Sequence, residues 1–143
     1  MVGLPGSGKS TWVKNNIVPP TRVVQPDAIR REVFGVQFDV RVEPAVWQIV
    51  RAMVSGYLTL GFSVVLDATN LTTRRRIPFI RIAQRHQAKV EAVVVATAVE
   101  ECLRRNAQRE AGQRVPPQVI INKSRYIEWP SYGEGIEEIK YVF

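Results

Sequence analysis

One short segment near the start of the chain limits its possible folds more than any other feature. It matches the pattern G-x-x-x-x-G-K-[ST] at all four fixed positions and consists of Gly3, Leu4, Pro5, Gly6, Ser7, Gly8, Lys9, Ser10 and Thr11. Glycines in such a segment let successive backbone N–H groups point to one place, and the helix that follows adds the positive end of its dipole. The pattern therefore predicts a concave site for the phosphates of a nucleoside triphosphate.

Individual side chains of this loop have separate expected tasks. We expect Lys9 to reach the β- and γ-phosphate oxygens of ATP or another NTP, Ser10 to ligate the bridging Mg²⁺, and Thr11 to help open the helix. The alternative is a glycine-rich turn that contains Lys-Ser by chance. Only Met1 and Val2 precede the loop, whereas a central strand usually has about five residues. Either the first strand is a stub, or the sequence begins inside a longer protein.

Strand-like and helix-like patterns alternate along the rest of the chain. Expected strands cover residues 22–25, 62–66, 90–99 and 136–143, and expected helices cover 11–16, 27–34, 44–61, 72–87, 100–109 and 116–129. With the phosphate-binding loop, this alternation predicts the α/β fold of P-loop NTPases and kinases, a parallel sheet between layers of helices. We expect residues 1–143 to form a single domain, with a short mobile lid at about residues 105–116.

The balance of charges favours phosphate-rich partners. The chain has 20 Lys and Arg against 13 Asp and Glu, a net charge of +7, and 15 of the basic residues are arginine. Guanidinium groups bind phosphate oxygens through paired hydrogen bonds, although a solvated basic surface would explain the excess equally well. The single cysteine, Cys102, cannot form an internal disulfide, which fits a cytoplasmic protein. The longest apolar run, residues 92–99, is too short to span a membrane.

Two of the three aspartates follow predicted strands at the sheet edge where ligands bind in open α/β folds. Asp27 is our candidate for the general base, which accepts the proton of an attacking hydroxyl. Its alternative role is that of a helix N-cap. Asp67 ends the strand at 62–66, where an acidic side chain can hold Mg²⁺ directly or through water. Its alternative role is capping or turn formation.

Three arginines are placed to contact phosphates. Arg30 lies one helical turn after Asp27, on the same side of the predicted helix. Arg105 and Arg109 are four residues apart, hence on one helical face, directly before the glycine-containing segment at 110–115. On a mobile flap, these two arginines would close over the triphosphate and neutralise developing charge. The alternative is an arginine-rich, exposed helix.

Four segments, taken in order, resemble the polynucleotide 5′-hydroxyl kinase family of P-loop phosphotransferases, which includes phage and bacterial enzymes that repair RNA and DNA ends. The matching segments are Gly3 to Trp12, Asp27-Ala28-Ile29-Arg30, Asp67-Ala68-Thr69-Asn70, and Arg105-Asn106-Ala107-Gln108-Arg109 followed by Val115-Pro116. The resemblance implies transfer of the γ-phosphate of ATP, or another NTP, to the 5′-OH end of RNA or DNA.

The resemblance also implies roles for individual residues. Asp27 would be the general base, and Arg30 would hold the acceptor phosphate next to the terminal nucleoside. Arg105 and Arg109 would be lid arginines on the donor phosphates. Together with Lys9 these residues form the expected catalytic set, while Ser10 and Asp67 form the expected metal site.

Two other functions fit the same fold. A small-molecule kinase would phosphorylate a sugar, a nucleoside or an antibiotic, and an ATP-binding switch or ATPase would have no acceptor but water. The position of Arg30 beside Asp27 argues against a neutral acceptor, because such an acceptor has no phosphate for the arginine to hold.

Overall fold

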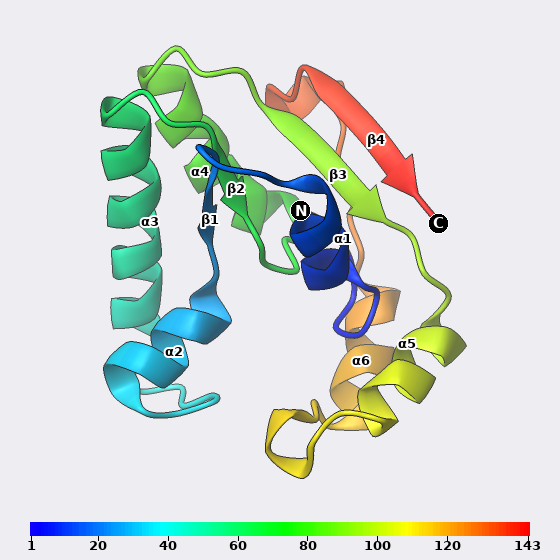
Figure 1. The fold of residues 1–143 in the computed structure, drawn as a ribbon. Coiled ribbons are helices and arrows are strands. Elements are labelled where there is room, and N and C mark those ends of the chain that lie inside the picture. Colours follow the sequence, from blue (N-terminus) through cyan, green and yellow to red (C-terminus); the bar gives the residue numbers. More distant parts are fainter.

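The computed structural model describes residues 1–143 and shows helices and parallel strands in alternation (Figure 1). The strands are β1 (Arg22–Val24), β2 (Val64–Leu66), β3 (Glu91–Val95) and β4 (Glu138–Val142). The helices are α1 (Lys9–Asn16), α2 (Pro26–Phe34), α3 (Glu43–Thr59), α4 (Thr73–Arg85), α5 (Val99–Ala107) and α6 (Pro117–Arg125), with short 3₁₀ helices η1 (Ala111–Gln113) and η2 (Tyr132–Glu134). The predicted α/β fold is confirmed. None of the helices has the length and apolar character needed to cross a bilayer.

The parallel sheet is reduced to a single residue at its centre. β1 pairs with β2, and β3 pairs with β4, both in parallel. Between these pairs, the N–H of Val2 donates to the carbonyl of Val93 at 2.8 Å, and the N–H of Val95 donates to the carbonyl of Val2 at 2.8 Å. On the other side, the amino group of Met1 donates to the carbonyl of Leu66 at 3.1 Å. The segment before the loop is thus paired with β3 through Val2 alone.

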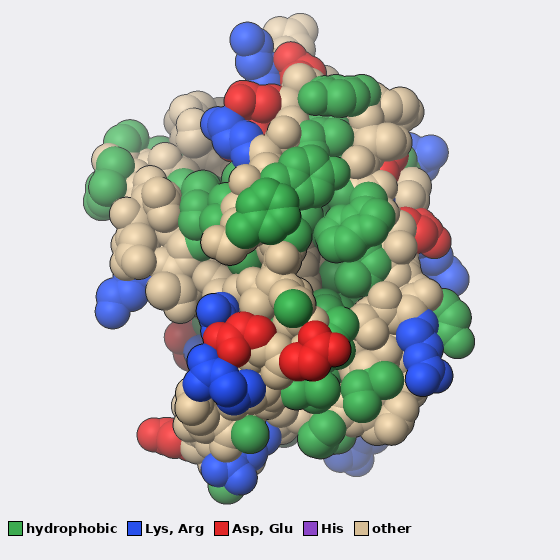
Figure 2. Space-filling view, turned by 90° about the vertical axis from the view of Figure 1, so that its right-hand side faces the viewer, with side chains coloured by type: hydrophobic (Ala, Val, Ile, Leu, Met, Phe, Trp, Pro, Cys, Tyr) green, Lys and Arg blue, Asp and Glu red, His purple; other side chains and the backbone are tan.

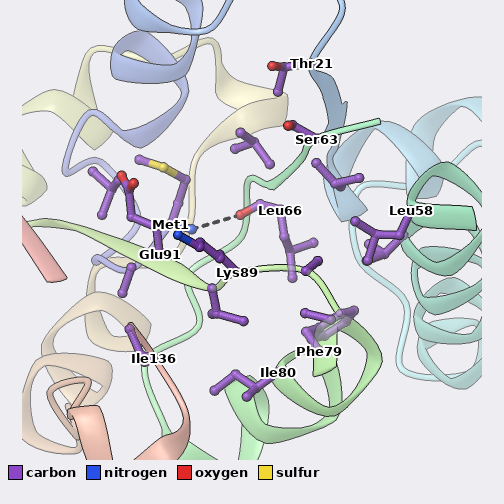
Figure 3. A pocket seen from close by; sticks show the side chains of 18 of the residues that line it. Met1, Thr21, Leu58, Ser63, Leu66, Phe79, Ile80, Lys89, Glu91 and Ile136 are labelled. Carbon is purple, nitrogen blue, oxygen red and sulfur yellow. Dashed lines mark hydrogen bonds between the residues drawn. The ribbon is translucent and has the colours of Figure 1, made fainter. Parts of the chain in front are cut away.

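A cavity of about 710 Å³ occupies the space between β2 and β3 (Figure 3). Hydrophobic residues make up 18 of the 26 that line it, and Figure 3 shows Phe79 and Ile136 among them. Burial lowers the pKa of the Met1 amino group to about 6, while the charge of Asp67 acts in the opposite direction. β2 borders this space and is only half-buried.

Buried apolar side chains form three separate clusters. One lies between β1, α2, α3 and α4, a second joins the phosphate-binding loop to α5 and α6, and a third lies between α4, β3 and the segment before β4. In this order, they contain Val24, Ile29, Val46, Val50, Val54 and Ile82; Leu4, Leu71, Cys102 and Ile120; and Ile80, Ala92 and Ile136. The loop is thus packed against α5 and α6. In contrast, α2, the helix that carries Asp27, is packed in a different cluster.

Four helices, α3, α4, α5 and α6, end earlier than the sequence patterns predict, α4 and α5 by two residues each. α3 ends at Thr59, and Leu60, directly after it, is 72% exposed. The cause is Gly61, whose φ of 79° turns the chain out of the helix. α6 ends at Arg125. Beyond it, the backbone N–H of Glu128 donates to the carbonyl of Leu71, which precedes α4, instead of continuing the helix.

The edge strand β4 leaves apolar surface open to solvent. Figure 2 shows the face that lies at the right of Figure 1, and hydrophobic side chains gather in its upper half. The strongly exposed aromatic side chains near the end of the chain are Trp129, Tyr132, Tyr141 and Phe143. β4 itself exposes Glu138, Lys140 and Tyr141, so charged and aromatic side chains are interspersed with the half-buried ones on this edge strand.

A buried ion pair fastens α4 to the C-terminal segment. Arg76 donates from Nε and Nη2 to the two carboxylate oxygens of Glu134, both at 2.7 Å, and each side chain is 5% exposed. Arg76 Nη1 also donates to the carbonyls of Asn70 and Glu128 at 2.9 and 2.7 Å. The guanidinium therefore ties three chain segments together, including the turn that follows β2.

We predict that Glu134→Gln lowers the free energy of unfolding by about 3–5 kcal/mol, because the change leaves the Arg76 charge buried without its partner. Urea unfolding at neutral pH would measure the loss, with the exposed Glu137→Gln as control. Hydrogen bonds from Arg76 lower the pKa of Glu134. The stabilisation is thus present above the ordinary glutamate pKa and fades as the pH falls through the lowered value. Equal stability of the two variants at neutral pH would contradict this account.

Candidate active site

The phosphate-binding loop rests on α5 and on the segment that leads into it. The carbonyl of Ser7 accepts hydrogen bonds from Thr97 Oγ1 at 2.7 Å and from Arg105 Nη1 at 3.1 Å. Gly6 has a φ of 84°, and a Cβ at this position would lie 2.5 Å from the carbonyl oxygen of Cys102. A side chain is excluded there by both conformation and space. The position of the loop against α5 is therefore fixed by direct backbone contact.

The side chain of Lys9, the first residue of α1, folds back over the loop. Its Nζ donates to the carbonyl of Leu4 at 2.7 Å and to Ser7 Oγ at 3.4 Å. Burial lowers the pKa of Lys9 to about 8, and the negative charges of Asp67 and, more weakly, Asp27 oppose this effect. Both aspartates thus lie close enough to act on Lys9, so the structure gathers these three predicted residues around one site.

Asp27 and Arg30 are in direct contact on α2. This helix begins at Pro26 with Gln25 at the N-cap position, so Asp27 lies in the first turn, and the alternative that it caps the helix is wrong. Arg30 Nη1 donates to Asp27 Oδ1 at 2.5 Å, while Nε and Nη2 donate to the carboxylate of Glu43 at 2.6 and 2.8 Å. The Asp27 side chain is 80% exposed, against 11% for Arg30. The candidate base is therefore accessible, while its arginine is held from the protein side.

Asp67 lies buried just after β2, and the structure gives it one hydrogen-bond donor. Gln25 Nε2 donates to Asp67 Oδ2 at 2.8 Å. Ser10, on α1, is exposed. Carboxylate and hydroxyl oxygens are ligands that Mg²⁺ accepts, and Mg²⁺ often takes only one or two protein ligands beside phosphates and water. Ser10 and Asp67 therefore suit Mg²⁺ by their chemistry, and the chain has no group of three or more His, Cys, Asp or Glu placed to hold a metal.

Arg105 connects α5 to the phosphate-binding loop. Besides its hydrogen bond to the Ser7 carbonyl, it donates from Nε to Glu101 Oε1 at 2.6 Å. Arg109 lies two residues beyond the end of α5, and its positive charge contributes to lowering the pKa of Lys9. Both predicted lid arginines therefore lie near the loop, and one of them contacts it directly.

An asparagine near the start of the predicted lid, residues 105–116, bonds to the backbone near the lid's end. Asn106 is 2% exposed; its Nδ2 donates to the Val115 carbonyl at 2.7 Å, and its Oδ1 accepts from the Val115 N–H at 2.9 Å. A Cβ at Gly112, in η1, would lie 3.5 Å from Gln37 Nε2. The lid thus reaches the loop between α2 and α3. Its mobility stays a prediction.

Two further cations lie beside Arg30. The Arg75 guanidinium lies over the ring of Trp47, 5.3 Å from its centroid, and Trp47 Nε1 donates to Glu43 Oε2 at 3.1 Å. Burial lowers the pKa of Lys123, and the positive charges of Arg75 and Arg30 lower it further. Arg75 and Lys123 thus bring two positive charges to this part of the molecule, together with the carboxylates of Asp27 and Glu43.

Three residues of this site were not identified from the sequence. Gln25 bonds to a carboxylate 42 residues away, and Thr97 bonds to the loop across 90 residues, so no local pattern relates them to their partners. Glu43 is an acidic residue in a first helical turn, where such residues are common. Nothing in the sequence indicated that its side chain turns to Arg30 instead of to its own helix.

Comparisons with known proteins agree with this fold. A solved structure with a similar fold is that of the Mycobacterium tuberculosis APS kinase CysC in complex with AMPPNP and APS. The two chains are 16% identical, with a TM-score of 0.61, and the match covers 98% of this chain and 84% of that one. This likeness shows the fold alone, an α/β P-loop kinase fold. A family model described as an AAA domain matches residues 1–125, and because this is most of the chain, the protein belongs to that AAA domain family.

Proposed function

We propose that this protein transfers the γ-phosphate of ATP, or another NTP, to a hydroxyl group on an acceptor that carries a phosphate beside that hydroxyl. The observation that carries the proposal is the contact between Asp27 and Arg30. It puts an accessible carboxylate, able to accept a proton, next to a guanidinium that still has hydrogen-bond donors to offer. An ATPase that uses water as its acceptor has no need for this pairing.

The remaining residues would act on the nucleotide. The backbone of the loop binds the phosphates, and Lys9 leaves the Leu4 carbonyl to reach the β- and γ-phosphate oxygens. Arg105 and Arg109 approach from the lid side and offset the negative charge that develops on the transferred group. Ser10 and Asp67 would hold Mg²⁺, which when bound supplies neutralising charge to the phosphate oxygens.

In the transfer step, Asp27 accepts the hydroxyl proton while the new O–P bond forms and the bond to the leaving NDP breaks. Arg30 orients the acceptor by holding its neighbouring phosphate, so that the hydroxyl approaches in line with the leaving group.

Two acceptor classes satisfy this chemistry. The likeness to a small-molecule kinase supports a small phosphate-bearing acceptor, such as a nucleotide. The order of the motifs and the net charge of +7 favour the 5′-OH end of RNA or DNA. The small acceptor has the better support from the fold comparison, and the polynucleotide depends on the motif resemblance.

We predict that Asp27→Asn lowers the rate of phosphoryl transfer by about 10²- to 10⁴-fold, because an amide cannot accept the hydroxyl proton. Nucleotide affinity should change little, since Asp27 does not contact the loop. Transfer of label from γ-labelled ATP to the acceptor would measure the rate, with Asp39→Asn as control, because that aspartate pairs with Arg41 outside the site. Unchanged transfer by Asp27→Asn would reject the role of general base.

Arg30→Ala should raise the KM for a phosphate-bearing acceptor by at least about tenfold while leaving the KM for ATP near its wild-type value. The comparison requires three acceptors: a 5′-OH oligonucleotide, a nucleoside 3′-monophosphate and the unphosphorylated nucleoside. Labelling of the oligonucleotide alone assigns a polynucleotide kinase, and labelling of the monophosphate alone assigns a small-molecule kinase. An equal KM for the phosphate-bearing acceptor in the wild type and in Arg30→Ala, or an equal rise of the KM for the neutral nucleoside, would remove the acceptor-phosphate role of Arg30.

The lowered pKa of Lys9, about 8, predicts a pH dependence of nucleotide binding. Raising the pH from 7 to 9 converts the free ammonium to a neutral amine, whereas bound phosphates hold the proton in place. The dissociation constant of a non-hydrolysable ATP analogue with Mg²⁺ should therefore rise by about tenfold over this range. Lys9→Arg stays charged and should show no such rise. Calorimetry at both pH values would measure it, and a flat wild-type profile would contradict the expected contact.

A further inference from the structure

The hydrogen bonds of Arg30 divide its guanidinium into an inner edge and an outer edge. A guanidinium has five N–H groups. Two of them, on Nε and Nη2, donate to the carboxylate of Glu43, and one on Nη1 donates to Asp27. One N–H on each terminal nitrogen is left without a protein partner. The inner edge is therefore committed to Glu43, and the remaining donors are those at the end of the side chain.

We propose that Glu43 is a positioning residue for the acceptor: it holds Arg30 by its inner edge, so that the free terminal N–H groups present themselves to the acceptor phosphate beside Asp27. This inference rests on the proposed function and assigns to it a residue that none of the sequence motifs contains. Glu43 does not itself contact the reacting groups. Its effect passes through the orientation of Arg30.

The surroundings of Glu43 suit this task. It is the first residue of α3, the side chain is 17% exposed, and its carboxylate also accepts a hydrogen bond from Trp47 Nε1 at 3.1 Å. Trp47 is in turn held by Phe79, with ring centroids 6.1 Å apart, and by the guanidinium of Arg75. Glu43 is thus fixed from two sides. A rigid carboxylate can hold Arg30 in one orientation, which a mobile one could not.

The position of Asp27 explains why Arg30 needs a second carboxylate. Arg30 is nearly buried, and its charge requires a partner. Without Glu43, Asp27 would be the only carboxylate in contact with the guanidinium. The arginine would then turn toward the candidate base, and the same movement would take its donors away from the acceptor. Glu43 therefore keeps the guanidinium paired while the base stays accessible.

The ordinary role of an acidic residue in a first turn is to stabilise its helix. The hydrogen bonds that the Glu43 carboxylate accepts come from the side chains of Arg30 and Trp47 and not from the backbone of α3. Its two oxygens are turned to Arg30 and to the indole of Trp47. Loss of Glu43 is thus expected to affect the orientation of Arg30 more than the integrity of α3.

The test compares Glu43→Gln with Glu32→Gln, which removes the same charge from an exposed position two residues from Arg30. Glu43→Gln should lower kcat/KM for a phosphate-bearing acceptor by about 10- to 100-fold and leave the KM for ATP unchanged. The double variant Glu43→Gln/Arg30→Ala should be no worse than Arg30→Ala alone, because Glu43 acts through the arginine. The Glu32 variant should match the wild type. Additive losses in the double variant would overturn the inference.

A measurement without turnover separates this inference from the proposed function. The Arg30 Nε–H proton, assigned by its absence in Arg30→Ala, should exchange slowly with water in the wild type and in Glu32→Gln, and rapidly in Glu43→Gln. Adenosine 3′-monophosphate should bind the wild type and shift the remaining Arg30 N–H signals, and should bind Glu43→Gln at least about tenfold more weakly. If the wild type forms no product but these results hold, the proposed reaction fails and the positioning role stands. Rapid exchange in the wild type, or equal binding by both proteins, overturns the positioning role.

Discussion

The close packing of the phosphate-binding loop against α5 is the constraint on which the rest of the site depends. The Ser7 carbonyl accepts two hydrogen bonds from this side of the molecule, and Gly6 approaches the Cys102 carbonyl too closely for any side chain. These contacts couple the loop to the helix that leads into the lid. Arg105 contributes to this coupling, because its side chain extends from α5 and donates to the Ser7 carbonyl of the loop. The phosphate-binding loop and α5 therefore form one packed unit.

The contacts around Asp27 are of a different kind: there, one guanidinium, that of Arg30, pairs with two carboxylates. Arg30 is nearly buried and shared between two carboxylates of unlike exposure. Glu43 is 17% exposed and accepts hydrogen bonds on both oxygens, whereas Asp27 is open to solvent. Burial favours a fixed ion pair on the inner side, while exposure keeps the outer carboxylate free to meet a hydroxyl group. Arg75 and Lys123 add positive charge to this part of the molecule.

The α/β fold could be predicted because its signals are local. The phosphate-binding loop, the β-branched runs and the alternation with helices each occur within a few residues, and the aspartates at strand ends followed from topology alone. Features that depend on distant contacts could not be predicted. The bond from Gln25 to Asp67, the turn of Glu43 toward Arg30 and the Arg76–Glu134 pair join elements far apart in sequence. The interrupted sheet was partly foreseen from the two residues before the loop, but not the cavity beside them, which leaves β2 half-buried.

The central claim is that phosphate leaves the nucleotide for an acceptor hydroxyl and not for water. ³¹P NMR of ATP, Mg²⁺ and the acceptor with the wild-type protein tests this most directly, because it follows every phosphorus atom. The account predicts a new phosphomonoester signal that grows in equal amount with ADP and disappears when the acceptor is omitted. ADP formed together with inorganic phosphate, at the same rate with or without acceptor, would contradict it.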